Sequence, residues 1–338
     1  MAQAYDAIIA TITVASDASQ VVKAMVKSTE WREGTSGSWL TTDCTLNAST
    51  TYQFRTPLSG MDSTPIAILP NIKASVTVDW DTTATPISTL GDSFMMGYAF
   101  DCSSLTSLSV PDTSGITSVG NDFMFSYAYG CNKLTSLSVP DTSGITSVGD
   151  FFMMGYAYDC SSLTSLDVPD TSGITSVGDY FMNYYAYGCS SLTSLGVPDT
   201  SNITSVGSFF MGYYASGCSG LKSLSVPDTS GITSVGSYFM YYYASGCSSL
   251  TSLILPAVGW FATHNIDWSV PSGRLGYLKG YANNVTDRDN WRALTTSTSP
   301  NTLYINYIRS ADDVILPPEP PETPVVGEKY ALPPFRRA

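Results

Sequence analysis

Six of the seven cysteines recur every 29 residues, and this spacing is the first feature of the sequence that could do chemistry. They are Cys102, Cys131, Cys160, Cys189, Cys218 and Cys247. A zinc site needs converging ligands, and near these cysteines there is neither a C-x-x-C pair nor a histidine. A disulfide needs Cβ atoms that point toward each other, whereas equivalent positions of stacked repeats hold them parallel. We therefore predict buried free thiols that act as small apolar side chains, and no cofactor.

A row of aspartates with the same interval is the second such feature. The row consists of Asp112, Asp141, Asp170, Asp199 and Asp228. Each aspartate lies between a proline and a Thr-Ser pair, where its carboxylate can accept a hydrogen bond from an amide of its own turn. The alternative is that calcium ions bridge neighbouring carboxylates, because like charges about 5 Å apart repel one another. We favour the turn and keep the row as a calcium candidate.

The third feature is an aromatic stretch that varies from repeat to repeat while the rest stays nearly constant. Tyrosine with Ser, Asn and Gly is typical of recognition surfaces, because tyrosine offers rigid contact area and a hydroxyl. The positions that we expect to face outward and bind a partner are Phe125, Tyr129, Tyr158, Asn183, Tyr184, Tyr187, Tyr213, Tyr241 and Tyr242. The alternative is that these rings pack between adjacent repeats and serve folding alone.

The remainder of the sequence argues against several functions. His264 is the single histidine, and no nucleophile elbow, phosphate loop or zinc signature is present, so we predict a protein that is not an enzyme. The net charge of −13 repels polyanions, which disfavours a nucleic acid partner. No run reaches the roughly 18 apolar residues of a membrane span, and no basic residue precedes the short apolar run from Ala7 to Ala15, so no signal peptide is recognised.

The element that must position all these residues is a repeat of 29 residues. A leucine opens each copy, at Leu105, Leu134, Leu163, Leu192, Leu221 and Leu250, and five copies are complete from 105 to 249. Within the first complete copy, "LTSLSV" and "ITSVG" predict two short strands, separated by a turn at "PDTSG". Phe123, Tyr127 and Cys131 then fall four residues apart, which predicts a short helix over about 121 to 130.

One such copy cannot fold alone, because ordering a residue costs about 1.5 kcal/mol and each copy buries few large side chains. Neighbouring copies are therefore predicted to stack strand on strand, about 4.8 Å apart, so that equivalent residues form columns. A residue inside a column must fit between identical neighbours, which explains why the inward positions do not vary.

The stretch "VPDTSGITSVGDYFMNYYAYGCSSLTSL" resembles the BspA-like leucine-rich repeat, and the resemblance covers residues 86 to 256. Residues 270 to 291 resemble the cap that closes such arrays. Each unit here is about six residues longer than the common form of the family. The resemblance implies a curved β-solenoid with short helices, a role in surface adhesion or recognition, and no catalysis.

We therefore predict a leucine-rich-repeat-like β-solenoid with four parts. Residues 1–75 form a small α+β domain with a helix in "SDASQVVKAMVKS", and residues 76–256 form the solenoid. Residues 257–315 form a C-terminal cap, and residues 316–338, with seven prolines, form an extended arm.

The predicted function is recognition of a glycan or protein receptor at an extracellular surface or on a phage or virus particle. The first alternative is a structural protein that forms homo-oligomers or larger assemblies through the solenoid ends and the arm. The second is an ice-binding solenoid, because threonine recurs in rows on the strands.

Overall fold

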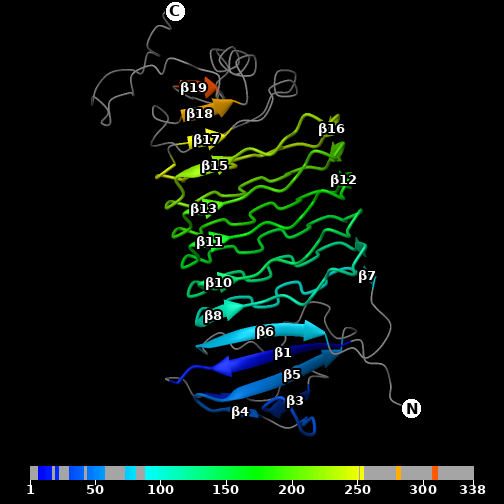
Figure 1. The fold of residues 1–338 in the computed structure, drawn as a ribbon, viewed down its shortest axis with the longest axis vertical. Helices are drawn as coiled ribbons and strands as arrows, with labels where there is room; N and C mark the ends of the chain where they lie inside the picture. Colours follow the sequence, from blue (N-terminus) through cyan, green and yellow to red (C-terminus); the bar gives the residue numbers. More distant parts are fainter. Residues whose placement is uncertain are drawn as a thin grey trace, which may run out of the picture.

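The repeats stack as parallel rungs in a computed structural model (Figure 1), which confirms the predicted β-solenoid. The structure describes residues 7–16, 20–22, 30–41, 44–57, 73–80, 88–250, 252–254, 279–282 and 307–310.

Two rows of short parallel strands run along the stack. The first row lies in "LTSL" and contains β8 (Leu105–Leu108), β10 (Ser136–Leu137), β11 (Ser165–Leu166), β13 (Ser194–Leu195), β15 (Ser223–Ser225) and β17 (Ser252–Ile254). The second row contains β7 (Thr89–Leu90), β9 (Ser118–Val119), β12 (Ser176–Val177), β14 (Ser205–Val206) and β16 (Ser234–Val235). Paired residues are 29 apart, as in Leu108 opposite Leu137, so equivalent side chains superpose in columns.

The core consists of these columns. In the first complete copy, the side chains of Leu105, Ile116, Phe123, Tyr127 and Cys131 are at most 2% exposed. Phe123 stacks on Phe152 with ring centroids 5.4 Å apart, and Tyr127 stacks on Tyr156 at 5.3 Å. Each buried side chain of this size contributes about 2 kcal/mol, and that contribution depends on the neighbouring rung being present.

The predicted helix over 121 to 130 is wrong, and no described residue of the repeats is helical. We call this stretch the aromatic segment; its equivalents are 92–101, 150–159, 179–188, 208–217 and 237–246. An α-helix with its side chains is about 10 Å wide, so a helix on every rung fits only where the rungs spread apart on that side of the stack. Here the Ser126 N–H donates to the Met154 carbonyl at 2.7 Å and the Ala128 N–H to the Tyr156 carbonyl at 2.9 Å, and these bonds keep the rungs too close for helices. The spacing of four residues arises instead from successive tight turns.

In the first part of the aromatic segment, alternate residues are left-handed. The φ angle is +57° at Asp122, +50° at Met124 and +54° at Ser126, and the same positions are left-handed in all the equivalent segments. The N–H groups of Ser126 and Ala128 donate to carbonyls of the next rung, while those of Phe125 and Tyr127 donate three residues back. Alternate hydrogen bonds therefore hold each rung together and join it to its neighbour.

The N-terminal part continues the solenoid as a sheet. Its strands are β1 (Ala7–Val14), β2 (Gln20–Val22), β3 (Glu30–Glu33), β4 (Cys44–Leu46), β5 (Thr51–Pro57) and β6 (Ala74–Trp80). A six-stranded sheet runs in the order β10-β8-β6-β1-β5-β3 and so crosses the predicted boundary at residue 75. The helix predicted in residues 16–28 is contradicted where β2 occupies 20–22; residues 23–29 lie outside the described part.

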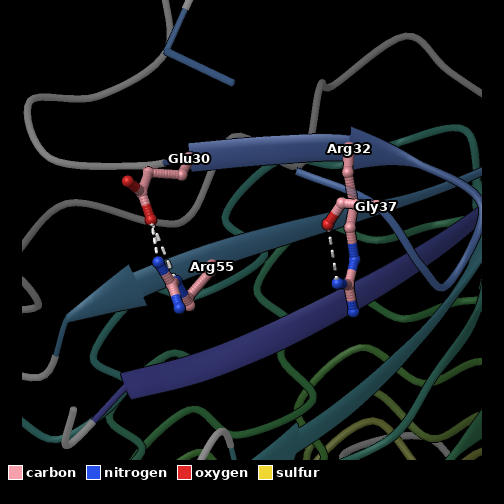
Figure 2. A network of polar contacts seen from close by, with 4 residues as sticks. All are labelled: Glu30, Arg32, Gly37 and Arg55. Carbon is pink, nitrogen blue, oxygen red and sulfur yellow. Dashed lines mark hydrogen bonds and ion pairs between the residues drawn. The ribbon is translucent and has the colours of Figure 1, made fainter. Parts of the chain in front are cut away.

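The edge of this sheet carries charged side chains (Figure 2). Arg55 on β5 pairs with Glu30 on β3, and the Arg32 guanidinium donates to the Gly37 carbonyl at 3.4 Å. Arg32 and Arg55 also lie over the Trp39 ring, 4.3 and 4.7 Å from its centroid. Charges on an edge strand discourage pairing with another chain.

At the other end, the first row of strands continues beyond the repeats. β17 pairs with β18 (Lys279–Ala282), and β18 pairs with β19 (Tyr307–Ser310), all in parallel. These two strands are the described portion of the predicted cap, and the predicted arm of residues 316–338 lies outside the described residues.

The buried tyrosine column provides a stability test. The Tyr156 hydroxyl donates to the Ser138 carbonyl at 2.5 Å, so Tyr156→Phe leaves that carbonyl without its partner and should cost about 1–3 kcal/mol of unfolding free energy in urea. Tyr158→Phe is the matched control, because its half-buried ring is retained and its hydroxyl bonds to no other described residue. If both variants lost the same unfolding free energy, the hydrogen bond from the buried Tyr156 hydroxyl would not be the cause.

Candidate functional site: the aromatic face

Outside the core, the aromatic segments form a surface of stacked rings, here called the aromatic face. The first outer column is Phe100, Tyr129, Tyr158 and Tyr187, with ring centroids 4.4 to 4.6 Å apart. The second outer column is Phe151, Tyr180, Phe209 and Tyr238, at 4.5 to 4.9 Å. The third outer column is Tyr184, Tyr213 and Tyr242, at 4.5 and 5.2 Å.

Most of the predicted binding residues lie on this face. Tyr129, Tyr158, Tyr184, Tyr187, Tyr213 and Tyr242 belong to the first and third outer columns. Tyr241 lies edge-on to Tyr213 and Tyr242, and Phe125 lies edge-on to Phe151 of the second outer column. All of these rings are half-buried, since each also packs against the adjacent rung. The two interpretations made from the sequence, a contact surface and packing between repeats, therefore describe the same rings.

Asn183 is the exception, and its predicted outward position is wrong. Its side chain is fully buried and fills the space above Gly212, where an added Cβ would lie 2.6 Å from the Asn183 Nδ2 atom. The Asn183 Oδ1 atom has no hydrogen-bond partner among the described residues. Asn183 therefore compensates for a missing side chain in the next rung and is not available to bind a partner.

Sequence reasoning missed five residues of the face. Tyr238 is 56% exposed and Phe100 is 45% exposed, and the other three are Phe151, Tyr180 and Phe209. Four of the five occupy one position of the repeat, directly before the invariant Phe, in successive copies. This aromatic recurrence was the available signal, and the helical interpretation concealed it by placing the position at the start of a helix.

Stacking determines which part of each ring is presented. A ring between two others has both faces covered, so that it offers only its edge and hydroxyl to the surroundings. In the first outer column the position after Tyr187 is Ser216, and in the third outer column the position before Tyr184 is Gly155. One face of Tyr187 and one face of Tyr184 are therefore not covered by a ring of their own column.

These two free ring faces lie on the same rung, pointing in opposite directions along the stack. Tyr213 flanks the Tyr187 face at 6.5 Å with an interplanar angle of 61°, and Tyr158 flanks the Tyr184 face at 5.9 Å and 51°. We call these two positions shelves: in each, a ring face lies beside a small, buried residue, Ser216 for Tyr187 and Gly155 for Tyr184.

The outer tyrosine hydroxyls differ from the buried ones. Each buried column hydroxyl from Tyr127 to Tyr243 donates to a backbone carbonyl 18 residues earlier, at 2.5 to 2.9 Å. The hydroxyls of Tyr129, Tyr158 and Tyr187 form no hydrogen bond within the described part of the chain. Burial, together with the neighbouring Tyr187 and Asp159, raises the pKa of Tyr158, so its hydroxyl is a proton donor at neutral pH.

Carboxylates border the aromatic face on both sides. Asp101 and Asp159 are exposed and directly follow rings of the first outer column. On the other side, the Asp150 Oδ1 atom accepts the Asp179 N–H at 2.8 Å and lies 2.0 Å from where a Cβ at Gly178 would be, so only glycine fits there. Residues 88–250 contain twelve aspartates and two lysines, which gives this part of the chain a net charge of −10.

The aspartate row predicted as a turn element or calcium candidate has the geometry of the turn. The Oδ1 atoms of Asp112, Asp141, Asp170, Asp199 and Asp228 each accept the N–H two residues later, at 2.9 to 3.0 Å. Hydrogen bonds from Ser114 lower the pKa of Asp112, and those from Ser172 lower the pKa of Asp170. Within the described ranges, no three His, Cys, Asp or Glu side chains form a group that could hold a metal ion.

The cysteine column consists of buried free thiols, as predicted. The Cys160 Sγ atom donates to the Ala128 carbonyl of the preceding rung at 3.0 Å, and the equivalent bond recurs along the column. Burial raises the pKa of Cys189 and of Cys247 to about 12, so neither is a thiolate at neutral pH.

The threonine hydroxyls that suggested the ice-binding alternative donate hydrogen bonds to the protein backbone. The hydroxyls of Thr135, Thr204 and Thr233 each bond to a backbone carbonyl of the preceding rung, at 3.0 to 3.3 Å. Hydroxyl protons used in this way are not available to order a water lattice, which weakens that alternative.

Comparison with known proteins relates the repeats to one family. Residues 94–258 match the BspA type leucine rich repeat region in six copies, and no curated protein matches the chain. A leucine-rich repeat protein from Bacteroides ovatus is 15% identical, with a TM-score of 0.17, over 62% of this chain and 74% of that one. Within the described part of the chain, no helix has the length and apolar character needed to cross a membrane.

The aspartate turn gives a first prediction for this region. Asp170→Ala removes the acceptor for Ser172 and should reduce unfolding free energy by about 0.5–1 kcal/mol at pH 7, whereas Asp170→Asn keeps an acceptor and should cost less. Because the folded pKa of Asp170 is lowered, this stability is present above the ordinary carboxyl pKa and is lost as pH falls through the folded value. A melting temperature that drops in EDTA would indicate bridging calcium instead.

The thiol column gives a second prediction. Native protein at pH 8 should resist iodoacetamide, because the thiols are buried and protonated, and denatured protein should be alkylated at all seven cysteines. Mass spectrometry before and after denaturation measures this. Fewer than seven alkylated cysteines in denaturant without reductant would reveal disulfides.

Proposed function

We propose that this protein, whose residues 94–258 are a BspA-type leucine-rich repeat region, is a non-enzymatic recognition protein that binds a glycan receptor through its aromatic face. The repeats serve as a rigid scaffold, and the variable rings of the aromatic segments supply the contact. The observation that carries the proposal is the step at Tyr184 and Tyr187, where two ring faces are free of stacking partners.

A sugar ring suits these shelves for physical reasons. Pyranose rings present a flat array of C–H groups that packs against an aromatic face, and their hydroxyls accept and donate hydrogen bonds at the rim. The exposed Asp159 carboxylate and the Tyr213 hydroxyl, which also hydrogen-bonds to Tyr184, are polar groups of the kind that sugar hydroxyls need. The same rigid tyrosine surface would also serve a protein receptor, which is the second possibility.

We further propose that the protein acts at the surface of a cell or on a phage or virus particle. The support for this is the repeat family, since BspA-type repeats are typical of surface proteins. Self-assembly through the solenoid ends is the alternative role, and a measurement of oligomeric state decides between them.

Glycan-array binding of the full chain tests the proposal. Tyr187→Ser removes a free ring face and should weaken binding about fivefold to tenfold, since one aromatic stacking contact contributes about 1 kcal/mol. Tyr129→Ser is the matched control, because that ring is stacked on both sides by Phe100 and Tyr158 and offers only its edge.

Thermal melts of both variants show whether folding is retained. Tyr187→Phe, which keeps the ring face and loses only the hydroxyl, should bind glycan nearly as well as the original chain. Equal losses for the Tyr187 and Tyr129 variants, or no glycan ligand at all, would overturn the proposal and leave a protein receptor or self-assembly.

A further inference from the structure

The hydroxyls along the first outer column form a row of donors that the fold leaves unused. Tyr129, Tyr158 and Tyr187 are stacked 4.4 to 4.5 Å apart, and none of their hydroxyls bonds to another residue within the described ranges. Since the ring faces are covered, the column presents edges and hydroxyls. A ligand with a row of hydrogen-bond acceptors complements these unused donors.

A polyproline II segment is such a ligand. The backbone of a polyproline II segment makes no internal hydrogen bonds, so its carbonyls are free to accept hydrogen bonds from the tyrosine hydroxyls. Proline has no backbone N–H, so at the prolines the segment offers acceptors and no donors. Proline-rich segments in this conformation dock against surfaces lined with aromatic side chains.

The chain itself contains a segment with this chemistry. Residues 329–338, "KYALPPFRRA", contain the pair Pro333 and Pro334 and three basic residues with no acidic one. The repeats between 88 and 250 carry a net charge of −10, and the exposed carboxylates of Asp101 and Asp159 border the first outer column. The charges of segment and face are therefore opposite in sign.

The connection is long enough for the segment to reach its own face. Eighteen residues, 311–328, join the end of β19 to this segment. Any chain of eighteen residues spans about 56 Å at the polyproline II rise of about 3.1 Å per residue. Five rungs separate β19 from the copy that contains Tyr187, a distance of about 24 Å at strand spacing.

We propose that residues 329–338 bind to the first outer column of the same chain, with the proline pair against the tyrosine edges and Arg336 and Arg337 beside Asp101 and Asp159. Tethering raises the effective concentration of this segment to the order of millimolar, so even a weak intrinsic affinity suffices for occupancy.

The test uses full chains and a fluorescently labelled peptide of sequence KYALPPFRRA, with anisotropy as the readout and no receptor present. In the original chain the tethered segment competes with the peptide. In a chain carrying Pro333→Ala, Pro334→Ala, Arg336→Ala and Arg337→Ala the face is vacated, so the peptide should bind about tenfold more tightly.

Two variants of that vacated chain identify the site. Tyr129→Phe, Tyr158→Phe and Tyr187→Phe together keep every stacked ring and remove the hydroxyl row, and they should weaken peptide binding about tenfold. Asp159→Asn should weaken binding more at low salt than at high salt. The matched control is Tyr180→Phe, which removes a hydroxyl from the second outer column and should have no effect.

Three outcomes would overturn the proposal. These are no peptide binding to the vacated chain, equal binding to both chains, and an original chain that elutes as a dimer which the segment variant converts to monomer. The last would assign the segment to a second copy. Because no receptor is used, failure of the glycan proposal leaves this result intact, and failure here leaves the glycan proposal intact.

Discussion

The distance between rungs is the constraint on which the rest of this structure depends. Backbone pairing sets that distance at about 4.8 Å between strands, and hydrogen bonds between successive aromatic segments keep the other side of each 29-residue copy equally close. Identical side chains satisfy this requirement by stacking in columns, which is why Leu, Phe, Tyr and Cys recur without variation on the inside. A substitution at one inward position is felt by both neighbouring rungs, since each contributes half of its packing surface.

The same constraint produces the unusual backbone of the aromatic segment. The ten residues of the segment have too little space between rungs to form a helix, yet their backbone N–H and carbonyl groups still need hydrogen-bond partners. It does so by alternating left-handed residues, with φ of +60° at Tyr180, +48° at Met182 and +57° at Tyr184, so that hydrogen bonds point in turn along the rung and across to its neighbour. A left-handed residue other than glycine costs about 1–2 kcal/mol, and the stacked columns offset this cost on every rung.

Stacking also decides what the protein can present to a partner. Within a column the rings offer edges and hydroxyls, and ring faces become available only where a column begins or ends. The copies differ most at these outer positions, so that the third copy combines the end of one column at Tyr187 with the start of another at Tyr184. Variation among otherwise identical repeats thus creates a local site on a regular surface. The carboxylates that border the aromatic face make its surroundings negatively charged.

The sequence by itself determined the repeat, the two strands, the turn at each aspartate, the buried thiols and most of the rings on the aromatic face. These follow from the 29-residue periodicity along the chain and from the local chemistry within each copy. The conformation of the aromatic segment and the burial of Asn183 beside Gly212 were decided by the tertiary structure alone. Each depends on what lies one rung away: a spacing of four residues predicts a helix only where about 10 Å of thickness is free, and an outward position is exposed only where the neighbouring side chain leaves it so.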